Sequence, residues 1–404
     1  MDLTLSTEQA LLRDAVRKHC EDQYRFHDRL AILRRPEGFS REHWKTYAEL
    51  GWLGALLPED VGGFAGSPVE LALIMEEFGR ALVLEPFLSC AVLAAQTVNA
   101  VGTEAHRRHL LPAVIKGELL LSLAHFELES RGDVQFIATS ATRTSKNSFL
   151  LSGRKSLVLS GATADLLIVS ARTYGDPQDR DGVSLFLVRP GTPGLIRRPF
   201  RMIDGGFAAE LEFTGLEVDR SVLLGEEGGA AEALERAVDY GIVGVCAEAV
   251  GVMDRVVTVT RDYLKTRRAY GTTLSTLQAL QHRLADMLVE LELSRSMLYR
   301  ALAGVASADC QARRKSLSAA KALIGRSGRF VGSQGIQLHG GIGMSDEYII
   351  GHLFKRLAVI EALFGNSDFH LNRMLESIDT HETHRPANRE DVEVGVLTST
   401  EMKL

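Results

Sequence analysis

The chain has 404 residues, of which 45% are apolar and 24% charged, so it is long enough for two or three packed units of an ordinary globular protein. Its net charge of −6 and the lack of Lys/Arg-rich runs with interleaved aromatics argue against a nucleic-acid partner. No stretch approaches the ~18 apolar residues of a membrane span, and residues 1–12 are too polar for a signal peptide, so we expect a cytoplasmic protein without a membrane partner.

Residues 1–120 are predicted to form an α domain. Ser6 and Gln9 have the spacing of a capping box, and the apolar residues that follow them have a helical period. Further helix-like segments, separated by Gly and Pro residues, continue to the end of this region.

Residues 121–226 are predicted to form a β domain, because short apolar runs alternate there with turn-rich joints. The predicted strands include 149–151, 156–159, 166–170, 183–188 and 209–213. Residues 227–380 return to a helical period, most clearly in one apolar stripe formed by Leu277, Leu280, Leu284, Leu288 and Leu291. Residues 381–404 form a charged tail whose order depends on docking. The predicted fold class is therefore α+β with three domains.

Cysteine and histidine positions give no sign of a metal site. The cysteines lie far apart in helical sequence, which predicts buried thiols: Cys20, Cys90, Cys246 and Cys310. Two histidine pairs have a three-residue spacing that metal ligands can share, but His106 and His109 lie in an Arg-rich helix, and His381 and His384 lie in the tail. We expect no metal. The sequence also lacks a nucleophile elbow and a P-loop.

The first notable motif is RRAYG at residues 267–271, followed by the helical sequence LQALQHRLADM at residues 277–287. A guanidinium can fork onto two phosphate oxygens, and Gly271 permits a turn into the next helix. A helix that merely ends in basic residues is the competing interpretation, because cations offset the helix dipole without any ligand. Spacing alone leaves both interpretations open.

The second motif is QLHGGIGM at residues 337–344, where three glycines interrupt a helical sequence. A backbone without Cβ atoms lets a ligand approach closely and offers N–H groups to anionic oxygens. An ordinary turn between helices is the competing interpretation. The motif is not a dinucleotide fingerprint, because no G-x-G-x-x-G follows a strand.

The two motifs and the helical–β–helical order together make residues 1–375 resemble the acyl-CoA dehydrogenase family, most strongly the small subunits of the pimeloyl-CoA dehydrogenase type. The resemblance implies an N-terminal helical domain, a middle β-barrel, a C-terminal four-helix bundle and FAD shared at a subunit interface. It also implies that six residues hold the pyrophosphate and adenine end of the neighbouring subunit's FAD: Arg267, Tyr270, Gln278, Gln337, Gly340 and Gly341.

The flavin end departs from the family pattern. The family's T-E-P-x-x-G-S-D segment falls on residues 126–133, where Phe126 replaces the threonine that contacts the flavin and Gly132 replaces the serine. The family's W-I-T-N segment falls on residues 157–160, where leucine stands at both contact positions. Leu157 offers no π-face, and Leu159 offers no hydroxyl. The resemblance therefore implies that these flavin contacts are lost.

The catalytic base is also missing from its expected positions. Desaturation of an acyl-CoA thioester needs a carboxylate to take the Cα proton while hydride leaves Cβ for the flavin. The family's Y-E-G-T segment falls on residues 364–367, where Gly365 replaces the glutamate. The alternative base position of some branches falls on Gly241. Neither residue can abstract a proton, so we expect no catalytic residue in this chain.

These losses favour a subunit of a heteromeric enzyme. A larger acyl-CoA dehydrogenase subunit would supply the base and the flavin pocket in an α2β2 assembly, with an acyl-CoA substrate and an electron-transfer flavoprotein as acceptor. One alternative is a homomeric dehydrogenase with a relocated base, for which the candidates are Glu248, Glu361 and Asp368. Each also has an ordinary role: Glu361 and Asp368 as solvated helix residues, Glu248 as a paired group in the bundle. A flavin-free structural or regulatory protein is the second alternative.

Overall fold

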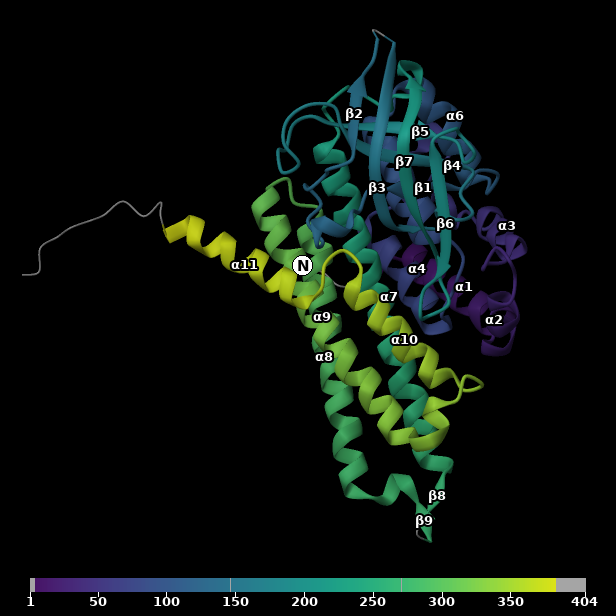
Figure 1. Cartoon of the computed structure of the whole chain (residues 1–404). Helices are drawn as coiled ribbons and strands as arrows, with labels where there is room; N and C mark the ends of the chain where they lie inside the picture. The colour runs from purple at the N-terminus through teal and green to yellow at the C-terminus, as the bar shows by residue number, and fades with distance from the viewer. Residues whose placement is uncertain (1–3, 146, 270, 383–404) are drawn as a thin grey trace, which may run out of the picture.

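The structure is a computed structural model that describes residues 4–145, 147–269 and 271–382. Tyr270 and residues 383–404, which include most of the predicted tail, lie outside the described residues. Figure 1 shows a β-sheet and short helices at one end of the molecule, and a bundle of long helices that projects away from them. The predicted order of a helical, a β and a second helical region is confirmed.

The N-terminal region is helical, as predicted. The capping box at its start is present: Ser6 Oγ accepts a hydrogen bond from the Gln9 backbone N–H (3.2 Å), and Gln9 Oε1 accepts one from the Ser6 N–H (3.1 Å). The helices are α1 (Thr7–Gln23), α2 (Phe26–Leu33), α3 (Arg41–Glu49), α4 (Pro68–Ala81), α5 (Ala95–Val101) and α6 (Glu104–Ile115), with shorter turns η1 (Trp52–Gly54) and η2 (Glu59–Val61) and a π-helix η3 (Phe87–Ala94).

The middle region forms a mixed sheet in the order β1-β4-β2-β3-β7-β6, with β5 paired to β4. Its strands are β1 (Leu121–Ala124), β2 (Ser140–Arg143), β3 (Ser148–Leu159), β4 (Leu166–Arg172), β5 (Val183–Val188), β6 (Leu195–Arg201) and β7 (Phe207–Asp219). β1 runs parallel to β4, whereas β3, β7 and β6 are antiparallel neighbours. The predicted strand segments all fall within β3, β4, β5 and β7.

The C-terminal region is built on three long helices that pack against one another, with two further helices packed on them. The bounds are α7 (Ala231–Thr266), α8 (Gln278–Val305), α9 (Cys310–His339), α10 (Ile349–Ala362) and α11 (Ser367–Glu382), with a small hairpin of β8 (Arg268–Ala269) and β9 (Thr272–Thr273) between α7 and α8. Part of the predicted leucine stripe lies off the buried face of α8: Leu291 is buried, but Leu288 is 48% exposed. The buried face instead continues through Met287 and Leu298.

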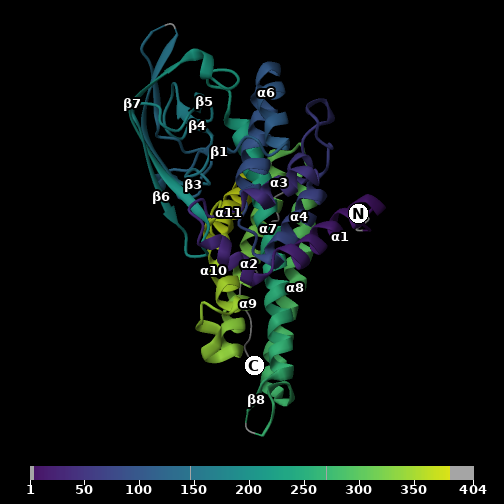
Figure 2. The same ribbon diagram turned by 90° about the vertical axis from the view of Figure 1, so that its right-hand side faces the viewer.

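Helix α7 links the two ends of the molecule, because it packs on α4 and η3 as well as on α8, α9 and α10. Figure 2 shows the sheet on one side and the N-terminal helices on the other, with α7 between them. Cys20, Cys90 and Cys246 are buried free thiols, as predicted, whereas Cys310 is half-buried. In the described part of the chain, no helix is long and apolar enough to cross a membrane.

Candidate active site

Phe364, which precedes one of the two positions expected to carry a catalytic base, packs on the other, Gly241. A Cβ added at Gly241 on α7 would lie 2.9 Å from Phe364 Cζ and 2.8 Å from Leu93 Cδ2. Phe364 immediately precedes Gly365 and is 4% exposed, so its ring fills the space beside Gly241. A carboxylate is therefore absent from both positions, and each glycine faces an aromatic ring: Gly241 that of Phe364 and Gly365 that of Phe369.

Buried polar groups form hydrogen bonds to the loop that carries Phe364 and Gly365. Lys321 on α9 donates hydrogen bonds to the backbone carbonyls of Glu361 (3.0 Å) and Gly365 (2.9 Å). His370 Nε2 donates to the Phe364 carbonyl (3.0 Å). Burial, together with the nearby cations of Lys321 and Arg373, lowers the pKa of His370 to about 3, so the imidazole stays neutral in this role.

The backbone of this loop adopts a conformation that is rare for residues other than glycine. Phe364 has φ +59°, and three more non-glycine residues with positive φ lie in the segments matched to the flavin end: Arg131, Leu157 and Ser160. Each such residue costs of order 1 kcal/mol and persists only where its surroundings hold it. Leu157 sits in a bulge where the pairing of β3 with β7 shifts register. Four of the six non-glycine residues with positive φ in the described chain therefore lie in this loop or in the segments matched to the flavin end.

Phe126, which is matched to the flavin end, lies beside the Phe364 ring. The rings of Phe126 and Phe364 have centroids 5.6 Å apart, and the Phe126 carbonyl accepts a hydrogen bond from the Ser156 N–H (2.9 Å). Leu157 and Leu159 pack against the same apolar core. None of these four side chains, Phe126, Leu157, Leu159 or Phe364, can donate or accept a hydrogen bond.

Glu127, which the sequence shares with the family segment, has a structural role here. Its carboxylate pairs with the buried Lys155 ammonium (2.6 Å) and accepts the backbone N–H groups of Ala138 (2.8 Å) and Thr139 (3.0 Å). Burial lowers the pKa of Lys155 to about 8, although Glu127 opposes that shift. Glu127 therefore fixes the loop to β3 and leaves no free oxygen for a substrate proton.

Of the three carboxylates considered for a relocated base, two are bound in ion pairs and one is exposed. Glu248 is buried and forms a two-pronged pair with Arg356 (2.5 and 2.7 Å), so its predicted pairing within the bundle is confirmed. Glu361 is buried, and the interpretation of it as a solvated residue is wrong: it accepts from the Ser367 N–H (3.0 Å), pairs with Arg329 (3.1 Å) and points at α9. Asp368 is exposed in the first turn of α11.

Glu85 is a buried carboxyl that the sequence did not single out. It lines a cavity of about 90 Å³ together with Ser89, Ser160 and Leu363. One oxygen accepts the Ser40 N–H (3.0 Å), and the other has no hydrogen-bond partner among the described residues. Burial raises the pKa of Glu85 to about 7. Its isolated position between two apolar runs gave no sequence signal, because the contact with Ser40 and the cavity arise only from folding.

The residues matched to the adenine end gather at the far tip of the bundle. Arg267 follows α7, Gln278 begins α8, and Gln337 lies in the last turn of α9. All three side chains are exposed, and none makes a hydrogen bond or ion pair with any residue that the structure describes. A Cβ added at Gly340 or Gly341 would meet no atom within 4 Å. The tip therefore offers open backbone and unpaired polar side chains.

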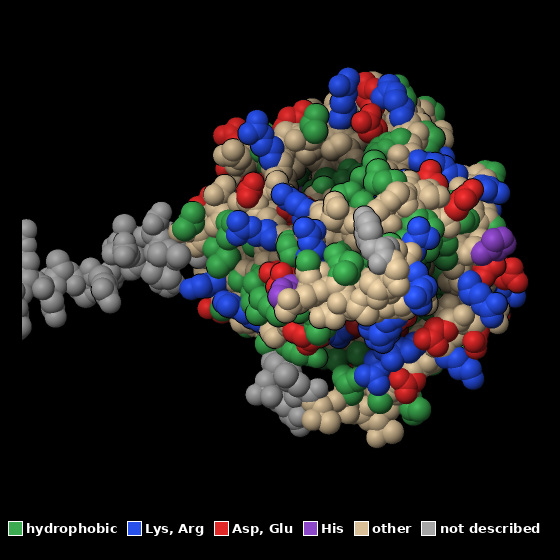
Figure 3. Space-filling view, turned by 90° about the horizontal axis from the view of Figure 1, so that it is seen from below, with side chains coloured by type: hydrophobic (Ala, Val, Ile, Leu, Met, Phe, Trp, Pro, Cys, Tyr) green, Lys and Arg blue, Asp and Glu red, His purple; other side chains and the backbone are tan. Residues whose placement is uncertain are grey.

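The tip has an internal support of its own. The rings of Tyr263 on α7 and His339 on α9 stack with centroids 4.4 Å apart, which ties the ends of the two helices together. Figure 3 looks onto this end of the molecule and shows Lys and Arg side chains beside the tip. Tyr270, the remaining residue of the predicted set, lies outside the described residues.

The tip and the surroundings of Phe364 are far apart within one chain. Gly241 and Thr266, the last residue of α7, are separated by seven helical turns, which corresponds to about 38 Å along the axis at 1.5 Å per residue. Figure 1 places the β8–β9 hairpin at the end of the bundle opposite the sheet. A single dinucleotide does not span this distance, so both places could serve one cofactor only across a subunit interface.

The family follows from comparison of the sequence with known domains. Three models match in order: the acyl-CoA dehydrogenase N-terminal domain over residues 6–118, the middle domain over 122–216 and the C-terminal domain over 226–378. The chain therefore belongs to the acyl-CoA dehydrogenase family, a family of FAD-dependent oxidoreductases.

Individual relatives are distant but similar over nearly their whole length. Acryloyl-CoA reductase (NADH) of Anaerotignum propionicum is 28% identical over 375 residues, which are 92% of this chain and 94% of that protein. A solved variant of the Tcur3481-Tcur3483 steroid ACAD is 29% identical, with a TM-score of 0.83 over 94% of this chain and 100% of that one. The ChsE4-ChsE5 complex from Mycobacterium tuberculosis, at 23% identity and a TM-score of 0.84 over 96% and 100% of the two chains, shares the fold.

The described residues fit one half of FAD and not the other. At the tip, unpaired Arg267 and open space around Gly340 and Gly341 suit a phosphate and an approaching ribose or base. At the flavin end, the side chains of Phe126, Leu157, Leu159 and Phe364 offer no hydrogen bond to an isoalloxazine ring. The side chains at this chain's own Phe364 site therefore do not fit a flavin ring.

Proposed function

We propose that this chain is the non-catalytic subunit of a heteromeric FAD-dependent acyl-CoA dehydrogenase. In this role it holds the adenine half of an FAD whose flavin ring lies in a larger partner subunit. The partner supplies the carboxylate base for α,β-desaturation of an acyl-CoA thioester. The assembly is an α2β2 tetramer of the pimeloyl-CoA dehydrogenase type, with one FAD for each pair of unlike chains.

The observation that carries the proposal is the Phe364 ring beside Gly241. Proton abstraction at Cα requires a carboxylate within hydrogen-bond reach of the substrate. Both positions that could place one there are glycines, and the buried Phe364 ring occupies the space beside Gly241. Glu248 and Glu361 are engaged in ion pairs elsewhere, which weighs against a base relocated to either.

The exposed tip supports a role toward a partner's cofactor. Arg267, Gln278 and Gln337 would donate hydrogen bonds to phosphate and adenine groups, and the chain itself provides no partner for them among the described residues. Retention of such groups has no use in a flavin-free structural protein. The assignment is also supported by the solved structures named for pairs of proteins, Tcur3481-Tcur3483 and ChsE4-ChsE5.

The acyl group and the electron acceptor are set by the partner in this scheme. Steroid side-chain, dicarboxylic and fatty acyl thioesters all remain candidates, and the similarity to a steroid ACAD makes the first of these the one to screen first. An electron-transfer flavoprotein is the expected acceptor, in a cytoplasmic enzyme that needs no metal.

The test is to measure flavin content and native mass of this chain alone and co-expressed with an acyl-CoA dehydrogenase-like partner. We expect a colourless protein alone and about one FAD per two chains in a mixed tetramer, because each half of the cofactor then has its own subunit. One FAD per chain in a homo-oligomer, with turnover, would overturn the divided site.

Replacing Arg267 by Ala tests the adenine clamp directly. Loss of a charge-assisted hydrogen bond to phosphate, worth roughly 1.5–3 kcal/mol, should weaken FAD retention in the complex about 10- to 100-fold. Lys265→Ala is the matched control, because Lys265 is an exposed cation in the last turn of the same helix. Equal FAD retention in the two variants would remove the clamp from the proposal.

A further inference from the structure

A cavity of about 220 Å³ lies between α1, α4 and α7, next to the first residue of α10. Four arginines line it: Arg17 on α1, Arg25 at the N-cap of α2, Arg80 on α4 and Arg255 on α7. Only two carboxylates, those of Glu21 and Glu77, line the same walls. The lining therefore carries more guanidinium groups than carboxylates, at the junction of N-terminal and C-terminal helices.

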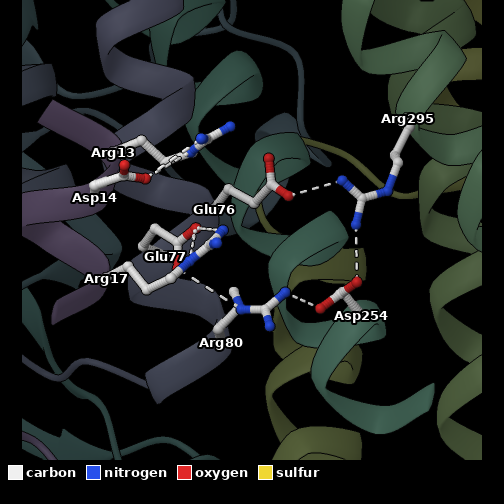
Figure 4. A network of polar contacts seen from close by, with 8 residues as sticks. All are labelled: Arg13, Asp14, Arg17, Glu76, Glu77, Arg80, Asp254 and Arg295. Atoms are coloured by element: carbon white, nitrogen blue, oxygen red, sulfur yellow. Dashed lines mark hydrogen bonds and ion pairs between the residues drawn. The ribbon is translucent and has the colours of Figure 1, made fainter. Parts of the chain in front are cut away.

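Two of the four arginines form ion pairs with acids of the same region. Arg17 forms a close pair with Glu77 (Nη2–Oε1 2.5 Å), and Arg80 pairs with Glu77 and with Asp254. Figure 4 shows that Arg295 on α8 pairs with the remaining acid, Glu76 (3.0 Å), and also with Asp254 (2.8 Å). Each carboxylate of this network therefore faces at least one guanidinium, and Glu77 and Asp254 each face two.

Arg25 and Arg255 are left without such partners. Neither side chain makes a hydrogen bond or ion pair with any residue in the described ranges, and Arg255 is half-buried. The surroundings are electrostatically unfavourable for a further cation: burial lowers the pKa of Arg80, Glu77 opposes this, and Arg17 and Arg255 lower it further. An anion in the cavity would offset this repulsion.

The remaining walls are aromatic and aliphatic. Tyr24 is buried, and Phe26 and Ile349 are half-buried at the cavity lining. Guanidinium groups recognise phosphate oxygens through paired N–H donors, while apolar walls suit an organic group. We propose that this pocket binds a small phosphate-bearing molecule, with Arg25 and Arg255 on the phosphate oxygens. The ligand then joins the N-terminal helices to the bundle through the two arginines.

The pocket is separate from the adenine clamp, so its probes must contain no adenine. Isothermal titration of the full-length chain, with its partner where one co-purifies, would use inorganic phosphate, phenyl phosphate and phenol. We expect both phosphates to bind and phenol not to bind. Tighter binding of phenyl phosphate assigns a phosphorylated organic ligand, and equal affinities assign inorganic phosphate itself.

The double variant Arg25→Ala/Arg255→Ala should bind phenyl phosphate at least about 10-fold more weakly, because it loses two charge-assisted contacts. Arg261→Ala is the matched control on α7, since Arg261 is exposed and paired only with Asp262. Arg267→Ala, at the tip, should also leave this binding unchanged. Without ligand, the double variant should melt at the same temperature or higher, because it loses only unpaired cations.

Two results would overturn the proposal. One is wild-type affinity for phenyl phosphate in a double variant that is folded by its melting curve. The other is no measurable binding of either phosphate to the wild type. Loss of FAD from the Arg267→Ala complex with retained phosphate binding would separate this pocket from the adenine clamp.

Discussion

Replacing Glu85 by Gln tests whether a buried carboxyl makes the stability of this protein depend on pH. Burial raises the pKa of Glu85 to about 7 from its ordinary value of 4.5, against the lowering effect of the Ser40 N–H. A pKa difference of one corresponds to about 1.4 kcal/mol, so the ionised carboxylate costs the folded protein about 3 kcal/mol relative to the unfolded chain. Gln keeps the acceptor for Ser40 but does not ionise.

The direction of the effect follows from proton binding. Between pH 4.5 and about 7, folded Glu85 keeps a proton that the unfolded chain releases, so raising the pH favours unfolding across this window. We expect the free energy of unfolding of the wild type to fall, relative to Glu85→Gln, by up to about 3 kcal/mol as the pH rises through the window. Below it, both proteins hold a neutral side chain and their difference should be constant.

Urea denaturation followed by tryptophan fluorescence is a suitable assay, because Trp44 and Trp52 are buried in the same helical region. The titration would be repeated at several pH values across the window. Glu129→Gln, which removes an exposed carboxylate, controls for the change in net charge. A stability difference between wild type and Glu85→Gln that stays constant with pH would refute the burial argument.

Two further substitutions test what holds the candidate site together. Phe364→Ala should lower the free energy of unfolding by roughly 3–5 kcal/mol, measured by urea denaturation, because the ring is only 4% exposed. The control is Phe330→Ala, which should cost less because Phe330 is 38% exposed. Similar losses in the two variants would mean that the Phe364 ring is not tightly packed. Arg356→Met should cost roughly 3–5 kcal/mol in melting experiments, because it leaves the carboxylates of Glu248 and Asp204 buried without their shared partner. Lys355→Met, beside it, removes only a surface pair and should cost under about 1 kcal/mol, so equal losses in the two methionine variants would contradict this reasoning.

The local elements were predictable from sequence where the pattern was also local. Short stretches of sequence are enough to predict the capping box of Ser6 and Gln9 and the apolar strands β3, β4, β5 and β7. β6 was not predicted because its residues are almost all exposed, so no apolar alternation marks it. The predicted place of Leu288 in the stripe of α8 failed for the opposite reason: a leucine pattern cannot tell an internal face from a surface that another subunit could cover.

At the candidate site, sequence indicated which residues to inspect but not what surrounds them. The family pattern drew attention to Gly241 and Gly365, yet the contact of Gly241 with Phe364 depends on α7 and the loop after α10 meeting in space. The Phe364 ring, the Lys321 support and Glu85 depend on the same long-range packing, for which a single sequence carries no signal. The arginine cavity is likewise assembled from five separate helices, α1, α2, α4, α7 and α10.

The loss of catalysis that we propose for this chain is compatible with a stable fold, because glycine at the two base positions removes one energetic cost while the Phe364 loop adds another. A buried base carries a desolvation penalty of several kcal/mol when ionised, as Glu85 illustrates at about 3 kcal/mol. Glycine at Gly241 and Gly365 removes that penalty, and burying the Phe364 ring gains roughly 2–3 kcal/mol against about 1 kcal/mol for its positive φ. The tip of the bundle, about 38 Å along α7, has a separate support in the Tyr263–His339 stack. If the proposed function holds, selection therefore closed the catalytic space of this subunit while it kept the proposed clamp for a cofactor held by another chain.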